Sequence, residues 1–199
     1  MEIKQLSSNL IDDYLEFFDN IAFSDHKDWS WCYCAFYHFD DDDIKKLREA
    51  GKENLRSEAV DLIKEKSIQG YLAYEENKVV GWCNCGNKKN YKRLRTYKEL
   101  WEEEEENVKI KSIVCFIVAP EMRNKGIATQ LLERVCSDAK SEGYSYIEAY
   151  PIKGGNNCFD LFHGPDKLYE KEGFSFYKEF EYGTIVRKYV TIPHDTIRT

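Results

Sequence analysis

The sequence predicts one domain of the mixed α/β class, with a sheet of about seven strands flanked by helices. Short apolar runs rich in β-branched residues alternate with segments whose apolar residues recur at helical spacing. Hairpin signatures join neighbouring apolar runs at two places along the chain. The chain of 199 residues has no internal repeat and no low-complexity linker, so residues 1–199 are expected to form a single domain.

The N-terminal part of the chain is predicted to begin with a strand and a helix. Glu2–Leu6 alternates like a strand, and Ser7 or Ser8 can cap the helix that follows. The apolar face of that helix consists of Leu10, Ile11, Tyr14, Leu15 and Phe18. Residues 21–39 are dense in aromatic side chains and have no clear period. They form either an irregular cover over the core or the wall of a substrate pocket.

The segment up to residue 67 is predicted to continue with two helices. The acidic run Asp40–Asp43 favours a helix start, because carboxylates are stabilised at the positive end of the helix dipole. The expected helices are Ile44–Ala50 and Asn54–Lys66, separated near Gly51.

Two hairpins are predicted. The first joins Ile68–Tyr74 to Val79–Cys85, and the second joins Phe174–Phe180 to Thr184–Val190. The last hairpin leaves a sheet edge that could pair with a second copy of the chain, so a homodimer is one expectation.

Residues 87–107 form a charged excursion between the first hairpin and the next strand. Its first half is basic and its second half is acidic. We expect either a solvated excursion with its own charge pairing, partly helical around Leu94–Trp101, or a lid or partner surface.

The most informative stretch is a strand, a turn and a helix in the middle of the chain. Ile113–Val118 reads as a buried strand, and Pro120 ends it. A compact turn around Gly126 leads into a helix that runs to about Glu142. Free backbone N–H groups at such a helix N-terminus, together with the positive end of the dipole, suit a phosphate.

The chain after this helix is predicted to supply one more strand and one more helix. Tyr146–Tyr150 reads as a strand that ends at Pro151. Pro165 can open the helix Asp166–Lys171, which stops at Gly173.

Composition limits the function classes. The net charge of −7 and the pI of about 5.3 argue against nucleic acid as a partner, since phosphate-backbone binding needs clustered positive charge. No apolar run approaches the length of a membrane span. The N-terminus lacks the regions of a signal peptide, and seven cysteines are most simply reduced thiols, so a cytoplasmic protein is expected.

The turn before the central helix resembles motif A of the GCN5-related N-acetyltransferases (GNAT family), Q/R-x-x-G-x-G/A. Six consecutive residues carry the resemblance: Arg123, Asn124, Lys125, Gly126, Ile127 and Ala128. The resemblance implies that their backbone amides hold the pyrophosphate of acetyl-CoA. It also implies that backbone groups of Phe116, Ile117 and Val118 pair with the pantetheine arm, and that the fourth and fifth strands of a mixed, mostly antiparallel sheet splay apart.

A second element, from Leu168 to Phe174, is similar to the L-Y-x-x-x-G-F element of the same family. The family tyrosine is proposed to protonate the leaving thiolate, so the resemblance assigns Tyr169 as general acid. The alternative is that Tyr169 is a packed aromatic above the cofactor. The family often has an asparagine seven residues before the tyrosine, and Phe162 stands there instead.

A general base is needed because an ammonium has no lone pair. The first candidate is Glu148, since some family members have a glutamate at this place and a lone carboxylate in an apolar strand would have a raised pKa. The alternative is a solvent-facing strand position. Other candidates are His163, Asp160 and Asp40–Asp43, and attack without a strong base is also open.

Two Cys-x-Cys pairs, Cys32 with Cys34 and Cys83 with Cys85, could together bind zinc. Their spacing and apolar surroundings favour buried free thiols instead, and we expect no metal.

The sequence therefore predicts an acetyl-CoA-dependent N-acetyltransferase. It is expected to act on a primary amine, and the acidic net charge favours a small cationic one. Residues 1–67 would lie on the substrate side, and 68–190 would form the cofactor-binding core. The alternatives are a non-catalytic acyl-CoA-binding sensor or interaction module, and a zinc-binding interaction protein.

Overall fold

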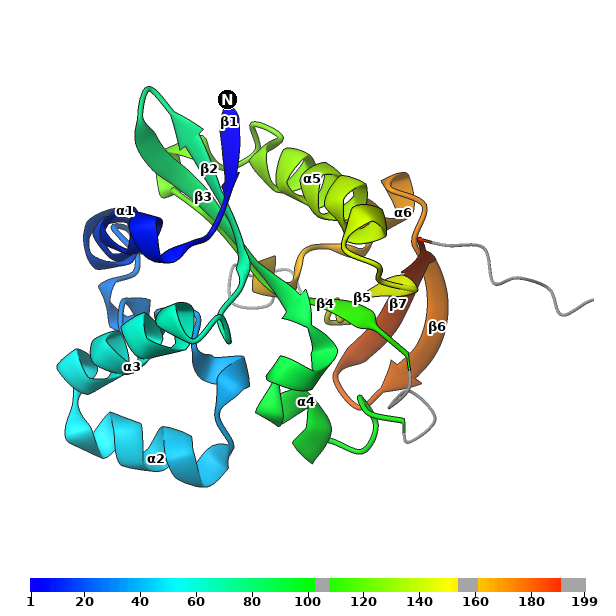
Figure 1. The fold of residues 1–199 in the computed structure, drawn as a ribbon, viewed down its shortest axis with the longest axis horizontal. Helices are drawn as coiled ribbons and strands as arrows, with labels where there is room; N and C mark the ends of the chain where they lie inside the picture. Colours follow the sequence, from blue (N-terminus) through cyan, green and yellow to red (C-terminus); the bar gives the residue numbers. More distant parts are fainter. Residues whose placement is uncertain (103–107, 154–160, 191–199) are drawn as a thin grey trace, which may run out of the picture.

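The computed structural model describes residues 1–102, 108–153 and 161–190 (Figure 1). Its centre is a seven-stranded sheet in the order β1-β2-β3-β4-β5-β7-β6, in which the β4–β5 pair is parallel and the other pairs are antiparallel. The strands are β1 Glu2–Gln5, β2 Gly70–Glu75, β3 Lys78–Asn87, β4 Ile110–Val118, β5 Tyr146–Ala149, β6 Ser175–Phe180 and β7 Gly183–Tyr189. The predicted α/β class, the seven strands and both hairpins are confirmed.

Strands β4 and β5 diverge in the middle of the sheet. Their register pairs Ile110–Ile113 with Tyr146–Ala149, where β5 ends. Strand β4 continues to Val118 and remains paired with β3 on its other edge. The predicted splay is therefore present, and the outer half of β4 offers one backbone edge to whatever lies beside it.

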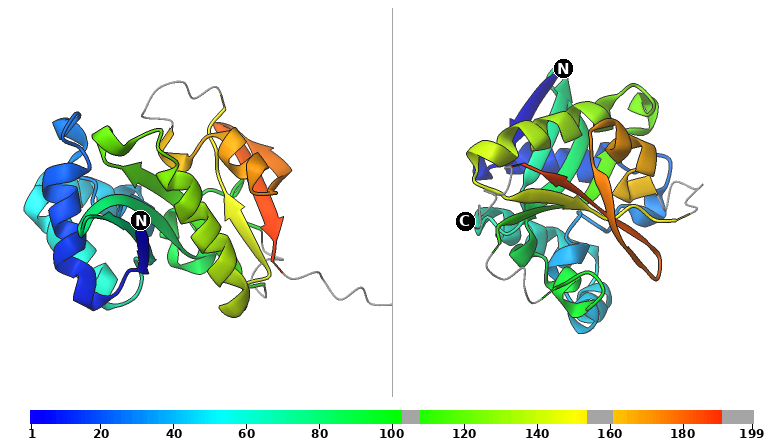
Figure 2. Two further views of the ribbon diagram at one scale, coloured as in Figure 1. Left: turned by 90° about the horizontal axis from the view of Figure 1, so that it is seen from above. Right: turned by 90° about the vertical axis from the view of Figure 1, so that its right-hand side faces the viewer.

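Helix α5, Ile127–Ser141, covers one face of the sheet together with α6, Asp166–Lys171 (Figures 1 and 2). The buried positions of α5 are Ile127, Leu131, Leu132, Val135 and Ala139, which is the predicted apolar stripe. The helix approaches β3 closely at Gly81, where a Cβ atom would lie 2.7 Å from Ile127. The strand–turn–helix unit predicted in the middle of the chain is thus present.

The opposite face is covered by the N-terminal helices, which share a second core with it. These are α1 Ile11–Glu16, α2 Asp41–Ala50 and α3 Lys52–Lys64. Asp40 and Asp43 form a reciprocal capping box at the start of α2, and Gly51 separates α2 from α3 with φ +93°. The acidic helix start and the break near Gly51 are confirmed. Ser7 is the N-cap residue of a short 3₁₀ turn, Ser8–Leu10, that leads directly into α1, but its side chain makes no capping hydrogen bond.

The described part of the charged excursion is anchored in the core by a few buried residues and is otherwise exposed. A 3₁₀ turn, Lys88–Asn90, leads into α4, Lys92–Thr96, and Lys88, Tyr91 and Leu94 are buried. The expectation of a solvated excursion is therefore wrong for Lys88 and Arg93, which are buried with partners, whereas the side chains of Lys89, Lys92, Arg95 and Lys98 are exposed as expected. Residues 103–107 lie outside the described chain. None of the described helices has the length and apolar character needed to cross a membrane.

Candidate active site

The turn between β4 and α5 exposes the N-terminus of a 15-residue helix. Gly126 is the N-cap residue with φ +80°, a left-handed conformation that glycine adopts without strain, and Asn124 has φ +61°. No described atom lies within 4 Å of where a Cβ of Gly126 would be, and no described side chain caps this helix. The first-turn amides therefore have no side-chain cap among the described residues, and free amides at a helix N-terminus suit a phosphate group.

The basic side chains of this turn are partly engaged. Arg123 donates two hydrogen bonds to Asp25, at 2.5 and 3.3 Å, and these bonds lower the pKa of Asp25. Lys125 lies against the sulfur of Met122, at 3.5 Å. Arg123 thus ties the turn to the aromatic stretch 21–39, and the expected phosphate contacts through the backbone of the turn stay a prediction.

The outer half of β4 lies next to this turn. Phe116, Ile117 and Val118 pair on one edge with Cys83, Trp82 and Gly81 of β3. Their other edge lies beyond the end of β5. The phenyl ring of Phe116 points to the α5 side of the sheet, where its centroid is 6.5 Å from that of Tyr169. The backbone edge and the helix N-terminus are thus consecutive in the chain, and an extended ligand with a phosphate group could contact both.

Tyr169 lies beneath this edge and is 1% exposed. Its hydroxyl donates a hydrogen bond to the carbonyl of His163, and Gly164 allows this approach because a Cβ there would lie 3.0 Å from the hydroxyl. Burial raises the pKa of Tyr169, so the phenol keeps its proton. Tyr169 is in the form that a general acid needs, but its proton is bonded to the turn Leu161–His163, so proton transfer requires an exchange of partners.

His163 joins the two sides of the site. Its Nε2 shares a hydrogen bond of 2.9 Å with the hydroxyl of Tyr37, which comes from the 3₁₀ turn Phe36–His38. Its Nδ1 is buried and has no hydrogen-bond partner among the described residues. Burial lowers the pKa of His163 to about 3, which keeps the imidazole neutral. Phe162, at the position where the family often has an asparagine, packs its ring 4.0 Å from that of His163.

Glu148 is neither a lone carboxylate nor a solvent-facing one. It is fully buried and accepts hydrogen bonds from Lys88 at 2.7 Å, from Tyr150 at 3.2 Å and from Arg187. Burial raises the pKa of Glu148 and lowers that of Lys88. The charge of Lys88 lowers the pKa of Glu148, and the charge of Glu148 raises that of Lys88, so the ion pair opposes both effects of burial. The expectation of an isolated glutamate in an apolar strand is therefore wrong, because a partner cation is supplied from the excursion, 60 residues earlier in the chain.

The acidic half of the excursion is attached to the last hairpin. Glu102 accepts hydrogen bonds from Tyr177 and Lys178, both at 2.6 Å, and Glu99 accepts one from the backbone N–H of Glu181. These carboxylates are held by β6 and the β6–β7 turn. The described part of the excursion is thus fastened across the end of the sheet and does not form an open lid.

The two Cys-x-Cys pairs lie apart. Cys34 packs in the core on the side of the N-terminal helices, whereas Cys83 and Cys85 pack in the core on the α5 side. Within the described residues, no three His, Cys, Asp or Glu side chains gather in a group that could hold a metal ion. Four thiolates around one zinc ion are therefore ruled out by the sheet that separates them, and the expected absence of metal itself stays a prediction.

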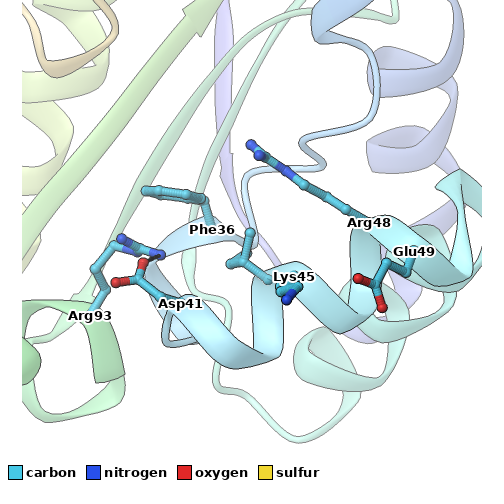
Figure 3. A pocket seen from close by; sticks show the side chains of 7 residues that line it. Phe36, Asp41, Lys45, Arg48, Glu49 and Arg93 are labelled. Carbon is cyan, nitrogen blue, oxygen red and sulfur yellow. Dashed lines mark hydrogen bonds and ion pairs between the residues drawn. The ribbon is translucent and has the colours of Figure 1, made fainter.

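A cavity of about 440 Å³ lies between α2 and α4 (Figure 3). Its wall carries three cationic side chains, Lys45, Arg48 and Arg93, and two carboxylates. The guanidinium carbon of Arg93 lies 3.8 Å from the centroid of the Phe36 ring, and Arg93 donates a hydrogen bond of 2.8 Å to Asp41. Figure 3 shows the Arg93 and Asp41 side chains pointing toward one another. Phe36 precedes Tyr37 in the same turn, so this cavity and the His163 side lie on either side of one short segment.

Comparison with known proteins agrees with this geometry. An acetyltransferase of unstated source is 16% identical to the chain, covers 96% of it and 100% of its own length, and superposes with a TM-score of 0.60. An aminoglycoside 6'-acetyltransferase type Ii is 15% identical (96% and 99% covered, TM-score 0.56), and a GNAT acetyltransferase from Streptococcus pneumoniae is 13% identical (96% and 99%, TM-score 0.55). These structural similarities show the fold that the chain adopts. No curated protein matches the sequence. The model of the Acetyltransferase (GNAT) family matches residues 26–163, more than half of the chain, so the chain belongs to the GNAT acetyltransferase family.

Proposed function

We propose that the protein transfers an acetyl group from acetyl-CoA to a primary amine by direct attack in a ternary complex. The observation that carries this proposal is that the outer edge of β4, which no described strand pairs with beyond Ile113, leads directly to the uncapped N-terminus of α5 at Gly126. An extended thioester arm can pair with the strand edge while its phosphates reach the helix amides. Backbone groups of Phe116–Val118 and of Arg123–Ala128 would hold it.

Tyr169 is the proposed general acid. It lies against Phe116 and keeps its proton because burial raises its pKa. The reaction balances if the amine nitrogen forms a bond to the acetyl carbon, the carbon–sulfur bond breaks, and the departing thiolate takes the phenolic proton. That Glu148 takes the amine proton stays a prediction. Its bonds to two buried cations favour a structural role, since a base must be free to accept a proton.

A small cationic amine is the proposed acceptor. The support is the net charge of −7, which attracts cations over long distances. The cavity between α2 and α4 gives no local support, because its wall has more cations than carboxylates. A panel of cationic, neutral and acidic amines tests the preference, and activity confined to neutral or acidic amines would reject it. The reduced thiols of the described cysteines suit a cytoplasmic location.

The alternative is a non-catalytic sensor of acyl-CoA, which shares the binding turn and differs at the chemistry. One structural observation favours this alternative: the Tyr169 hydroxyl donates its hydrogen bond to the His163 carbonyl, so the proton of the proposed acid is already bonded within the protein. A thiol-release assay with acetyl-CoA and the amine panel, run beside a calorimetric titration of acetyl-CoA, separates the two. Amine-dependent thiol release supports the enzyme, whereas tight binding without release for every amine, including a protein N-terminus or lysine, supports the sensor.

A homodimer through β6 remains a proposal. This strand is one of the two edges of the described sheet, and Phe176 on it is 63% exposed. Sedimentation of the wild type and of Phe176→Lys tests it: a dimer that dissociates in the variant supports edge pairing, and a monomeric wild type rejects it.

A further inference from the structure

The imidazole of His163 is placed between the cofactor side and the N-terminal side of the site. The turn that carries it, Leu161–His163, packs against β4. Its carbonyl is fixed by Tyr169 from the α5 side, and its ring meets Tyr37 edge-on, with centroids 5.7 Å apart. Tyr37 lies near Cys115, which belongs to the part of β4 beyond the end of β5. Burial raises the pKa of Tyr37, and the nearby Cys115 thiol raises it further. The ring is therefore beside the strand edge on which the thioester would lie.

One nitrogen of this ring lacks a partner. Nε2 is bonded to Tyr37, whereas Nδ1 is buried and has no hydrogen-bond partner among the described residues. Buried polar atoms in proteins are nearly always bonded, so this nitrogen, in a turn that packs against β4, is a candidate to receive a ligand atom.

The chemistry of the acceptor decides what this nitrogen can do. A neutral amine attacks with its lone pair, so a ring N–H aimed at that lone pair would block the attack. A ring lone pair would instead accept one of the amine N–H groups and leave the amine lone pair directed at the acetyl carbon. Only the tautomer with hydrogen on Nε2 presents that lone pair at Nδ1, and in it Nε2–H donates to the Tyr37 oxygen.

We propose that His163 is a further catalytic residue, whose Nδ1 accepts a hydrogen bond from the acceptor amine and then its proton, and that Tyr37 is the positioning residue that fixes its tautomer. This inference rests on the proposed acetyl transfer and names the proton acceptor that Glu148 is poorly placed to be. The nitrogen–carbon bond forms, the carbon–sulfur bond breaks, the amine proton passes to Nδ1, and the thiolate takes the proton of Tyr169. Because the neutral ring is a weak base, the amine must arrive uncharged, and the proton moves only as the new bond makes the nitrogen acidic.

The test compares three variants by thiol release, after circular dichroism has shown that each is folded. His163→Gln places an amide near Nε2 and preserves the contact with Tyr37 but removes Nδ1; kcat is expected to fall by about 10² to 10⁴ with an unchanged KM for acetyl-CoA. Tyr37→Phe keeps the ring and is expected to lower kcat by about tenfold, the effect of one lost hydrogen bond. His38→Asn is the matched control. His38 also has a buried, unpartnered Nε2, but its ring packs on Tyr91 and its Nδ1 faces the Asn90 carbonyl.

The control should keep kcat within a factor of about three of wild type, whereas His163→Gln should not. An active wild type whose His163→Gln variant retains its kcat overturns the inference and leaves the proposed function standing. A wild type that releases no thiol with any amine overturns the proposed function, and this inference with it.

A second readout does not depend on the variants folding or on turnover. Long-range proton–nitrogen NMR spectra of the ¹⁵N-histidine-labelled wild type report the tautomer of each ring. We expect His163 to be neutral with hydrogen on Nε2, and Tyr37→Phe to give a mixture of tautomers. A His163 ring with hydrogen on Nδ1 in the wild type overturns the inference.

Discussion

Lys88 and Glu148 form a buried ion pair, with the ammonium nitrogen 2.7 Å from the carboxylate, and this pair fastens the charged excursion to the central sheet. Arg187 of β7 completes the cluster on the other side of Glu148. Charges removed from water require partners, so the three side chains depend on one another. The cluster explains why a segment that reads as solvated in the sequence packs against the sheet.

Removing Lys88 should destabilise the fold. Lys88→Met leaves Glu148 with one cationic partner and should lower the free energy of unfolding by about 3 kcal/mol. Lys92→Met is the matched control. Lys92 pairs with Asp40 and Asp43 but its side chain is 51% exposed, so its loss should destabilise the fold much less than the loss of Lys88. Urea denaturation of both variants measures this difference. An equal loss in the free energy of unfolding for both would mean that the buried pair stabilises the fold no more than the exposed one.

Glu148→Gln separates a structural role from catalysis. If Glu148 is an anchor for Lys88 and Arg187, the variant melts at a lower temperature but, while folded, keeps kcat within about tenfold of wild type. A loss of about 10² or more in kcat for a fully folded variant would instead identify Glu148 as the base. Melting curves and thiol-release rates on the same samples distinguish these results.

Gly126→Ala tests the cofactor turn. The left-handed conformation at φ +80° costs a residue with a side chain about 1–2 kcal/mol, and the turn can avoid that cost only by moving the amides that would hold the phosphates. Gly143, at the other end of α5, has φ +75° and similar free space, so Gly143→Ala carries the same strain away from the site. Calorimetry should show weaker acetyl-CoA binding for Gly126→Ala alone. Equal affinities in the two variants would count against the assignment.

Tyr169→Phe removes the proposed acid and preserves the ring contacts with Phe116 and Phe174. The rate of thiol release should fall by about 10² to 10³, with the affinity for acetyl-CoA nearly unchanged. A variant with wild-type rates would show that Tyr169 only clamps the turn Leu161–His163.

The buried histidines should make stability depend on pH. Burial lowers the pKa of His163 to about 3 and that of His38 to about 4, below the ordinary value of 6.5. Between those values the unfolded chain binds more protons than the folded one, so the free energy of unfolding falls as pH falls. Each histidine contributes about 1.4 kcal/mol per pH unit. Urea titrations between about pH 4 and 6 should give a shallower slope for His163→Gln than for wild type, and identical slopes would contradict the burial of a neutral ring.

The strand–turn–helix unit could be predicted because its signals are local. The apolar run of β4, the glycine of the turn and the stripe of α5 lie within one short stretch of chain, and each has a direct physical meaning. The splay of β4 and β5 followed from the family resemblance and agrees with the register, which stops at Ile113 and Ala149. The helix start at Asp40–Asp43 could also be predicted, because a capping box is a local sequence pattern.

The contacts around the chemistry could not be predicted, because they join residues that are far apart in the chain. Tyr37 and His163 are 126 positions apart, and Lys88 and Glu148 are 60 apart. A lysine-rich segment gives no sign that one of its cations will be buried beside a strand carboxylate. His163 was among the candidate bases, but the signal that distinguishes it, an unpartnered ring nitrogen, exists only in three dimensions.

The most direct test of the central claim is a calorimetric titration of acetyl-CoA into the wild-type protein, followed by thiol release with the amine panel in the same buffer. We expect saturable binding with one site per chain, weakened by Gly126→Ala, and amine-dependent release of CoA. No binding of acetyl-CoA by the folded protein would contradict the assignment of Arg123–Ala128 as the pyrophosphate turn, and the proposed function and the role of His163 would both fail.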